Sequence, residues 1–205
     1  MTGTGPSTPT GPSTPTGPTP PAGPVELPAG LGLNHDRLAL AWSAARAAGD
    51  LLHGGRGEQL TVSTKSTRTD VVTQMDAAAE TSIVDAIVGE FPDDGVLGEE
   101  GADRPARSGV RWIIDPLDGT VNYLYGLPGW AVSIAVEVHG EVEVGVVDVP
   151  MYGETYVAVR GQGAVRWAGG RAHALVPNAP VELGQVLVAT GFGYSAVRRA
   201  AQART

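Results

Sequence analysis

Two aspartates, Asp115 and Asp118, lie three positions apart at the end of an apolar stretch of the chain. That stretch, residues 110–114, is rich in β-branched side chains and is typical of a buried strand. Pro116 has no backbone N–H to donate to a neighbouring strand, and the Asp118-Gly119 pair favours a turn. Along a continuing strand the two carboxylates would point to opposite faces. We therefore expect the strand to stop before Pro116 and a turn to bring the carboxylates to one point.

A second segment with acidic residues follows an apolar pair just upstream. Residues 98–100 read Gly-Glu-Glu and come directly after the apolar residues 96–97. Crowded carboxylates repel one another unless a proton or a cation offsets the repulsion, and ligands that are all oxygen suit Mg²⁺, Mn²⁺ or Ca²⁺. Gly119 and Thr120 are expected to open a helical turn whose N–H groups point towards a phosphate. Together these features indicate a site that hydrolyses a phosphate ester.

Each segment taken alone also has an ordinary structural interpretation. An Asp-Pro-x-Asp-Gly sequence is commonly a turn between strands, and a Gly-Glu-Glu sequence is commonly a solvated loop. Because both segments occur here, each at the end of an apolar strand, their combination favours a metal site.

Together the two segments resemble the metal-binding signature of the inositol monophosphatases, a family of Mg²⁺-dependent, lithium-sensitive sugar phosphatases. The resemblance rests on residues 97–100 and 112–120. Further segments that fit the same pattern are residues 65–76, 122–123, 126–128, 130–134 and 145–147. The resemblance extends from about residue 33 to the end of the chain.

The resemblance implies a set of metal ligands. Glu99 and Asp115 would bind a first Mg²⁺ through their side chains, with the carbonyl of Leu117 as an additional ligand. Asp115 and Asp118 would be two of the ligands of a second ion. The family uses two or three Mg²⁺ ions, for which Mn²⁺ can substitute.

The same resemblance implies residues that bind phosphate and place the attacking water. Asp118, Gly119 and Thr120 would bind the substrate phosphate, partly through backbone N–H groups. Thr120 and Asp76 would be catalytic, because the threonine hydroxyl would place the water and Asp76 would help to orient it. Thr73-x-x-Asp76 also has the form of a capping box, so the capping of a helix is an alternative role for Asp76.

Composition restricts the classes of protein that the chain can represent. It has 205 residues, a net charge of −8, 42% hydrophobic residues and no cysteine. This excludes disulfides and thiolate zinc sites, and an acidic chain lacks the electrostatic features of proteins that bind nucleic acid or anionic membranes. We therefore expect no nucleic acid and no membrane as partner, and the resemblance implies a small phosphorylated substrate. The N-terminus lacks the features of a signal peptide, so we expect a cytoplasmic location.

Three regions follow one another along the chain. Residues 1–30 are rich in Pro, Gly, Ser and Thr and are predicted to form a disordered tail. Residues 31–185 are predicted to form an N-terminal α+β domain that binds the metals, and residues 186–205 to begin a C-terminal α/β domain. Because the chain ends at Thr205, we expect this second domain to be largely missing, together with a further aspartate ligand that it supplies in the family.

Hydrophobic periodicity predicts the elements that position these residues. Helices are expected at 34–52 and 73–90. Strands are expected at 96–97, 110–114, 130–139, 141–149, 155–159, 164–167 and 186–190, and a helical end at 195–205. The predicted fold is α+β, with two helices packed on an antiparallel sheet as in the first domain of the layered αβαβα inositol monophosphatase fold.

A polar stretch between the two helices is expected to edge the site. It spans residues 57–72 and contains Lys65, Arg68 and Asp70. The resemblance places Lys65 near the metal ions, and the alternative is an ordinary solvated lysine.

Two functions remain open at this stage. The first is a Mg²⁺-dependent phosphatase that hydrolyses inositol monophosphate or a related small phosphate monoester with a metal-activated water, and the resemblance also implies a homodimer. The second is a truncated, catalytically weak or inactive family member that acts only as a binding or regulatory protein. A third explanation for the early end is that the chain is a fragment of a longer gene or comes from a frameshifted reading frame, which would restore the first function.

Overall fold

The computed structural model of the protein describes residues 35–56, 62–64, 71–179, 181–189, 191 and 196–204. The predicted tail at 1–30 and the polar residues Lys65, Arg68 and Asp70 lie outside the described residues.

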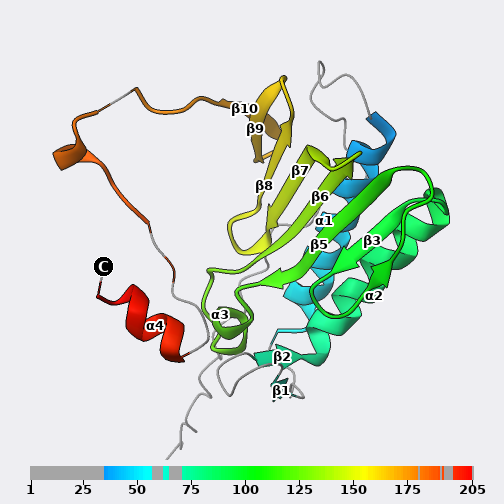
Figure 1. The fold of residues 1–205 in the computed structure, drawn as a ribbon, viewed down its shortest axis with the longest axis horizontal. Helices are drawn as coiled ribbons and strands as arrows, with labels where there is room; N and C mark the ends of the chain where they lie inside the picture. Colours follow the sequence, from blue (N-terminus) through cyan, green and yellow to red (C-terminus); the bar gives the residue numbers. More distant parts are fainter. Residues whose placement is uncertain are drawn as a thin grey trace, which may run out of the picture.

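An eight-stranded sheet forms the centre of the fold (Figure 1). Its spatial order is β10-β9-β8-β7-β6-β5-β3-β4. The strands are β3 (Gly95–Gly98), β4 (Asp103–Arg104), β5 (Val110–Asp118), β6 (Ala131–Val138), β7 (Glu141–Val149), β8 (Glu154–Val159), β9 (Gly163–Ala168) and β10 (Arg171–Leu175). The four strands predicted at 130–139, 141–149, 155–159 and 164–167 form an antiparallel meander, β6 to β9. Strand β5 pairs antiparallel with β6, and β10 adds a strand that was not predicted.

One pair of strands in this sheet is parallel. Strand β3 runs parallel to β5, because the short strand β4 carries the chain back along the edge of the sheet before β5 begins. The sheet is therefore mixed, not wholly antiparallel as predicted. This pairing decides where the acidic residues lie, because the carboxyl ends of two parallel strands meet at the same edge of a sheet.

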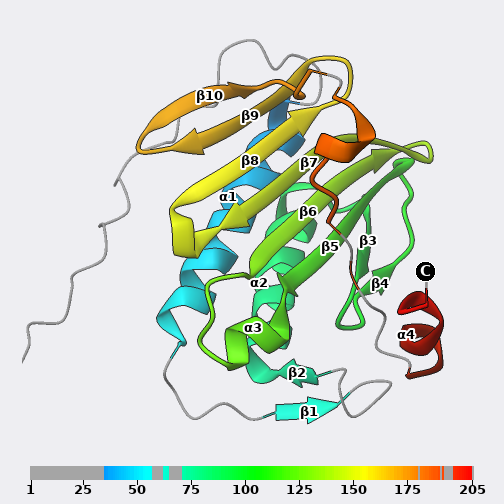
Figure 2. The ribbon, with the colours of Figure 1, turned by 90° about the vertical axis from the view of Figure 1, so that its left-hand side faces the viewer.

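Two long helices cover one face of the sheet (Figures 1 and 2). Helix α1 (His35–Gly54) contacts β6 and β7, and α2 (Gln74–Glu90) contacts β5. The residues at helical spacing on the inner faces of both helices are buried, and they are Leu38, Trp42, Ala45, Gly49 and Leu52 in α1, and Ala79, Ile83 and Ile87 in α2. The predicted α+β class with two helices on a sheet is confirmed.

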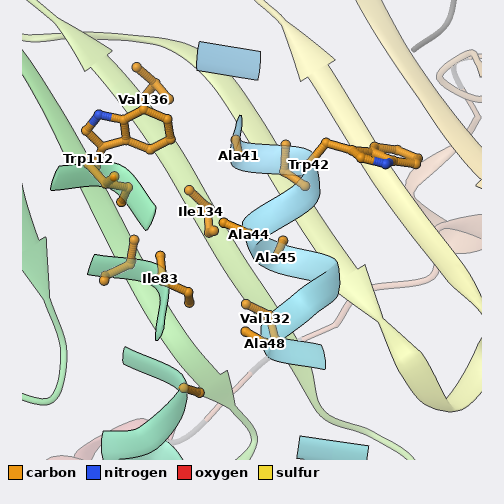
Figure 3. Packing of buried hydrophobic residues seen from close by; sticks show 14 of the residues in the cluster. Ala41, Trp42, Ala44, Ala45, Ala48, Ile83, Trp112, Val132, Ile134 and Val136 are labelled. Carbon is orange, nitrogen blue, oxygen red and sulfur yellow. The ribbon is translucent and has the colours of Figure 1, made fainter. Parts of the chain in front are cut away.

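The core lies between this helical layer and the sheet. Figure 3 shows side chains of this core from three elements, Ile83 of α2, Ala45 of α1 and Ile134 of β6. Trp112 of β5 is fully buried, and Trp42 of α1 packs edge-on against the partly buried Trp167 of β9. Burial of a large apolar side chain contributes about 1.5–3 kcal/mol, so this layer is what holds β5 in place.

Several smaller elements complete the described chain. Strands β1 (Val62–Thr64) and β2 (Val71–Thr73) form an antiparallel ribbon that leads into α2. The others are α3 (Thr120–Leu124), the 3-10 turns η1 (Pro150–Tyr152) and η2 (Leu183–Gln185), and α4 (Ala196–Gln202). Helix α4 confirms the predicted helical end. Of the described helices, none is both long enough and apolar enough to cross a membrane.

The strand predicted at 186–190 is wrong for residues 186–189, the described part of that segment, which form no strand. The apolar residues that suggested it are exposed, and Leu187 is 98% exposed. A strand needs a neighbour to satisfy its backbone groups, and no pairing with this segment is formed among the described strands.

Candidate metal and phosphate site

Asp115 and Asp118 belong to one continuous strand, and a bulge lies between them. The prediction that the strand stops before Pro116 is wrong, because β5 pairs with β6 at both Asp115, opposite Ser133, and Asp118, opposite Ala131. Three steps along β5 thus match two steps along β6, so β5 contains one extra residue. Since Ser133 and Ala131 are two positions apart, they share a face, and the bulge places both aspartates on the same face. The missing N–H of Pro116 is compatible with such a bulge.

Glu99 lies beside Asp115 because β3 and β5 are parallel. The backbone N–H of Glu99 donates to the carbonyl of Ile114 at 3.1 Å, and the Glu99 and Asp115 carboxyl groups are within hydrogen-bonding reach. Burial, the charge and hydrogen bond of Glu99, and the charge of Asp118 raise the pKa of Asp115 to about 7, opposed by the N–H of Leu117. The three acids that come from two sequence segments therefore act on one another.

This arrangement needs a proton or a cation, because two ionised carboxylates in contact are unfavourable. Oxygen donors from carboxylates suit a hard cation such as Mg²⁺. Within the described residues, no group of three or more His, Cys, Asp or Glu side chains is arranged so that it could hold a metal ion. The contact is made by Glu99 and Asp115. Asp118 is exposed and acts on Asp115 through its charge. The donor chemistry fits a hard cation at the carboxylate pair.

Asp76 caps helix α2 and also accepts a hydrogen bond from Thr120. It is fully buried, and its Oδ2 accepts hydrogen bonds from the backbone N–H and the hydroxyl of Thr73 at the start of α2. The predicted capping box is confirmed. The other oxygen, Oδ1, accepts a hydrogen bond from the hydroxyl of Thr120 at 3.0 Å. The cap thus fixes a carboxylate that also reaches Thr120.

Leu117 connects the two groups of residues. Its N–H donates to Asp115 Oδ1 at 3.2 Å, and its carbonyl lies 3.1 Å from the hydroxyl oxygen of Thr120. The carboxylate pair and the Asp76–Thr120 pair are therefore joined through one residue of the bulge.

Gly119 turns the chain from β5 into α3. Its φ is 90°, in the left-handed region that favours glycine, and a Cβ here would lie 2.6 Å from the carbonyl oxygen of Gly129. The turn places Thr120 at the first position of α3. A side chain at position 119 would displace the segment that carries Thr120.

A family profile described as the inositol monophosphatase family matches residues 34–205. The chain belongs to the inositol monophosphatase family. The matched residues include every residue of the site described above.

Named relatives of this family differ in the activity that their names state. A "Nus factor SuhB" from Pasteurella multocida is 45% identical over 130 residues, which cover 62% of this chain and 48% of the relative. A "Histidinol-phosphatase" from Chlorobaculum parvum is 44% identical over 128 residues, covering 62% and 49%. An "Inositol-1-monophosphatase" from Mycobacterium leprae is 42% identical over 148 residues, covering 69% and 50%. The chain spans about half the length of these relatives.

A solved structure of the family has the same fold. The structure "Mycobacterium tuberculosis SuhB" matches with a TM-score of 0.68 and 33% identity, over 82% of this chain and 62% of that chain. The α+β arrangement that holds the acidic residues is therefore that of an inositol monophosphatase.

The sequence interpretation missed one buried acid next to the site of this family member. Glu80 lies on α2, one helical turn after Asp76, and its carboxylate accepts hydrogen bonds from the backbone N–H groups of Glu100 and Ala102. A signal was present in the sequence, because residues four apart on a helix share a face and the first of them was already a candidate.

Proposed function

We propose that the protein is a Mg²⁺-dependent phosphatase that hydrolyses inositol monophosphate or a related small phosphate monoester. The observation that carries this proposal is the contact between Glu99 and Asp115 at the carboxyl ends of β3 and β5. In sheets with parallel strands, ligands commonly bind at this end of the strands. The relatives named as phosphatases support the same reaction class.

The residues proposed to hold the metal are Glu99, Asp115 and Asp118 through their side chains and Leu117 through its carbonyl. Bound Mg²⁺, for which Mn²⁺ can substitute, supplies a water of lowered pKa and offsets negative charge on the carboxylates and the phosphate. The raised pKa of Asp115 supports this assignment, because burial and the negative charges of Glu99 and Asp118 disfavour the ionised form and a nearby cation would favour it.

Thr120 and Asp76 are proposed to orient the attacking water. When the Thr120 hydroxyl donates its hydrogen to Asp76, its oxygen keeps lone pairs that can accept a hydrogen from a water molecule. Asp76 is a fixed acceptor, because the Thr73 cap holds its other oxygen. The oriented water would then point an oxygen lone pair at the phosphorus atom.

The phosphate is proposed to bind where β5 passes into α3. The backbone N–H groups of Gly119 and Thr120 belong to the first turn of the helix, where N–H groups have no partner within the helix. Asp118 precedes them and would contact phosphate through a shared cation, since two anions do not bind directly.

The relative from Pasteurella multocida that is named as a Nus factor favours a second candidate function. A family member named as a Nus factor supports a binding or regulatory role for a chain that shares its sequence, with weak or no catalysis. The lack of three converging metal-binding side chains in the described part of the chain fits this alternative as well.

The decisive experiment measures phosphate release from inositol 1-phosphate while Mg²⁺ is titrated. We expect release that depends on Mg²⁺ and is abolished by a chelator, with Glu99→Gln slowed by about 100-fold or more, since a metal contributes several kcal/mol to the transition state. Asp85→Asn is the matched control, because Asp85 is an exposed acid of α2 away from the site. Histidinol phosphate, assayed in parallel, identifies the preferred monoester.

Two results would contradict the phosphatase proposal. One is a rate that is the same with Mg²⁺ and with chelator. The other is a Glu99→Gln variant as active as Asp85→Asn. Metal binding without any phosphate release would favour the binding or regulatory function.

A further inference from the structure

A buried acid outside the proposed ligand set holds the segment that carries Glu99. Glu80 is 7% exposed, although it carries an ionisable group on a helix that faces the sheet. Its carboxylate oxygens accept one backbone N–H each, from Glu100 to Oε2 at 2.8 Å and from Ala102 to Oε1 at 2.9 Å. Hydrogen bonds to an ionised acceptor are about twice as strong as neutral ones, so this contact is a strong restraint on residues 100–102.

Gly98 makes room for this carboxylate. A Cβ at this position would overlap Glu80 Oε2 and Cδ and would lie 3.0 Å from the Ala102 side chain. Gly98 also closes the turn, because its N–H donates to the Ala102 carbonyl at 2.7 Å. Glu80 thus occupies the inside of the turn formed by residues 98–102.

Glu99 is fixed on both sides as a result. Its own N–H donates to the Ile114 carbonyl, one residue before Asp115. The N–H of the next residue, Glu100, donates to Glu80. These two contacts determine the direction in which the Glu99 side chain leaves the backbone, and that direction brings it to Asp115.

We propose that Glu80 is a positioning residue that sets the Glu99 carboxylate beside Asp115, so that α2 organises both halves of the site. One turn of this helix presents Asp76 to Thr120, and the next presents Glu80 to the turn that carries Glu99. The consequence for metal binding rests on the proposed function, whereas the consequence for the turn does not. A carboxylate is required, because an amide offers one acceptor oxygen and would direct its NH₂ group at a backbone N–H.

The first measurement is Mn²⁺ binding by calorimetry to the full chain and to its variants. We expect Glu80→Gln to weaken Mn²⁺ binding by about 10- to 100-fold, the usual effect of removing a residue that orients a metal ligand. Glu90→Gln is the matched control, because it makes the same change at an exposed position of the same helix. If Glu80 acts through Glu99, then Glu80→Gln has no further effect in the Glu99→Gln background.

If Glu80 only stabilises the turn and does not position Glu99, the result will be different. Glu80→Gln would then bind Mn²⁺ as Glu90→Gln does, or its effect would add in full to that of Glu99→Gln. Either result overturns the proposal.

The second measurement is amide hydrogen exchange without metal. We expect faster exchange of the Glu100 or Ala102 N–H in Glu80→Gln, by about 10-fold or more, because a charge-assisted hydrogen bond is lost. Unchanged exchange at both amides overturns the positioning role. If the wild-type chain binds no Mn²⁺, the proposed function fails and the exchange result alone decides the role of Glu80.

Gly98→Ala is a second variant that keeps the charge of Glu80. Its Cβ displaces the Glu80 carboxylate from the turn, so it should reproduce both effects of Glu80→Gln. It also keeps the proposal testable if Glu80→Gln does not fold. Wild-type exchange and Mn²⁺ affinity in Gly98→Ala would contradict the proposal.

Discussion

The parallel strands β3 and β5 have an acid near each end, the buried Asp94 and the partly buried Asp115, and the charges around the two acids differ. Asp94, directly before β3, accepts hydrogen bonds from Arg37 at 2.8 and 3.0 Å, from Ser108 at 2.6 Å and from the Trp112 indole at 2.9 Å. Burial alone would raise the pKa of Asp94, but these hydrogen bonds and the Arg37 charge outweigh it, so its pKa lies below the ordinary value.

Asp115, towards the other end of β5, has negatively charged neighbours instead of a cation. Burial, Glu99 and Asp118 all raise its pKa, and the N–H of Leu117 opposes them. Removal from water makes ionisation of both carboxylates less favourable. The Arg37 cation offsets this cost at Asp94, whereas the negative charges near Asp115 add to it. The first acid serves the fold, and the second retains an attraction for a proton or a cation, which is what a binding site needs.

The largest expected difference between the two ends is in catalysis. We expect Asp115→Asn to lower kcat/KM for phosphate release by roughly 10³-fold, because it removes a proposed metal ligand that would act in the transition state. Asp94→Asn should leave kcat/KM per folded molecule unchanged, because Asp94 lies at the opposite end of the strands. Steady-state assays corrected for the folded fraction test this. Equal losses in the two variants would remove the distinction between the ends.

Metal addition should stabilise the protein only through the end of the strands that carries Asp115. We expect Mg²⁺ at 100 times its dissociation constant to raise the free energy of unfolding of the wild type by about 2.7 kcal/mol. Asp94→Asn should gain the same amount from its own lower baseline, and Asp115→Asn should gain almost nothing. Urea denaturation with Mg²⁺ or with chelator measures these differences. If Mg²⁺ stabilises Asp115→Asn as much as the wild type, the cation binds at another site.

Without metal, the order of stability should reverse. Asp94→Asn is expected to lower the free energy of unfolding by about 1.5–3 kcal/mol, because Arg37 loses a charged partner. Asp115→Asn should be as stable as the wild type or more stable, since it removes repulsion with Glu99. Urea denaturation at neutral pH in chelator compares the two variants. A strongly destabilised Asp115→Asn would show that Asp115 also serves the fold.

The smallest expected effect is a dependence of stability on pH in the metal-free protein. The pKa of Asp115 is raised from 3.8 to about 7, so the unfolded chain loses this proton first as the pH rises. Its contribution to stability is therefore full below pH 4 and is lost as the pH approaches 7, by on the order of 1 kcal/mol after solvent screening. Asp94, with a lowered pKa, contributes in the opposite sense and loses its contribution as the pH falls through its folded pKa.

Denaturation from pH 4 to pH 8 tests this against a matched control. Asp115→Asn should show a smaller loss of stability between pH 4 and 7 than the wild type. Burial raises the pKa of Asp148 to about 6, opposed by the hydrogen bond from Thr155. Asp148→Asn should therefore remove a separate loss of stability that is complete near pH 6. A wild-type slope in Asp115→Asn would contradict the raised pKa.

Local patterns in the sequence were sufficient for most of the elements. The spacing of apolar residues in α1 and α2, the capping box at Thr73 and the apolar runs of strands β6 to β9 each act within a few residues. The strand prediction failed at residues 186–189 for the same reason, because an apolar run forms a strand only beside a partner, and none of the described strands pairs with it. The metal ligands, identified by resemblance, stay a prediction.

The sequence by itself determined which residues are acidic, which are apolar and where helices begin, because those properties depend on near neighbours. The tertiary structure alone decided that β3 pairs in parallel with β5, that β5 continues through a bulge and that Glu80 enters the turn at residues 98–102. These contacts join residues far apart in the chain. Their free energy depends on packing and backbone pairing, which no local pattern encodes.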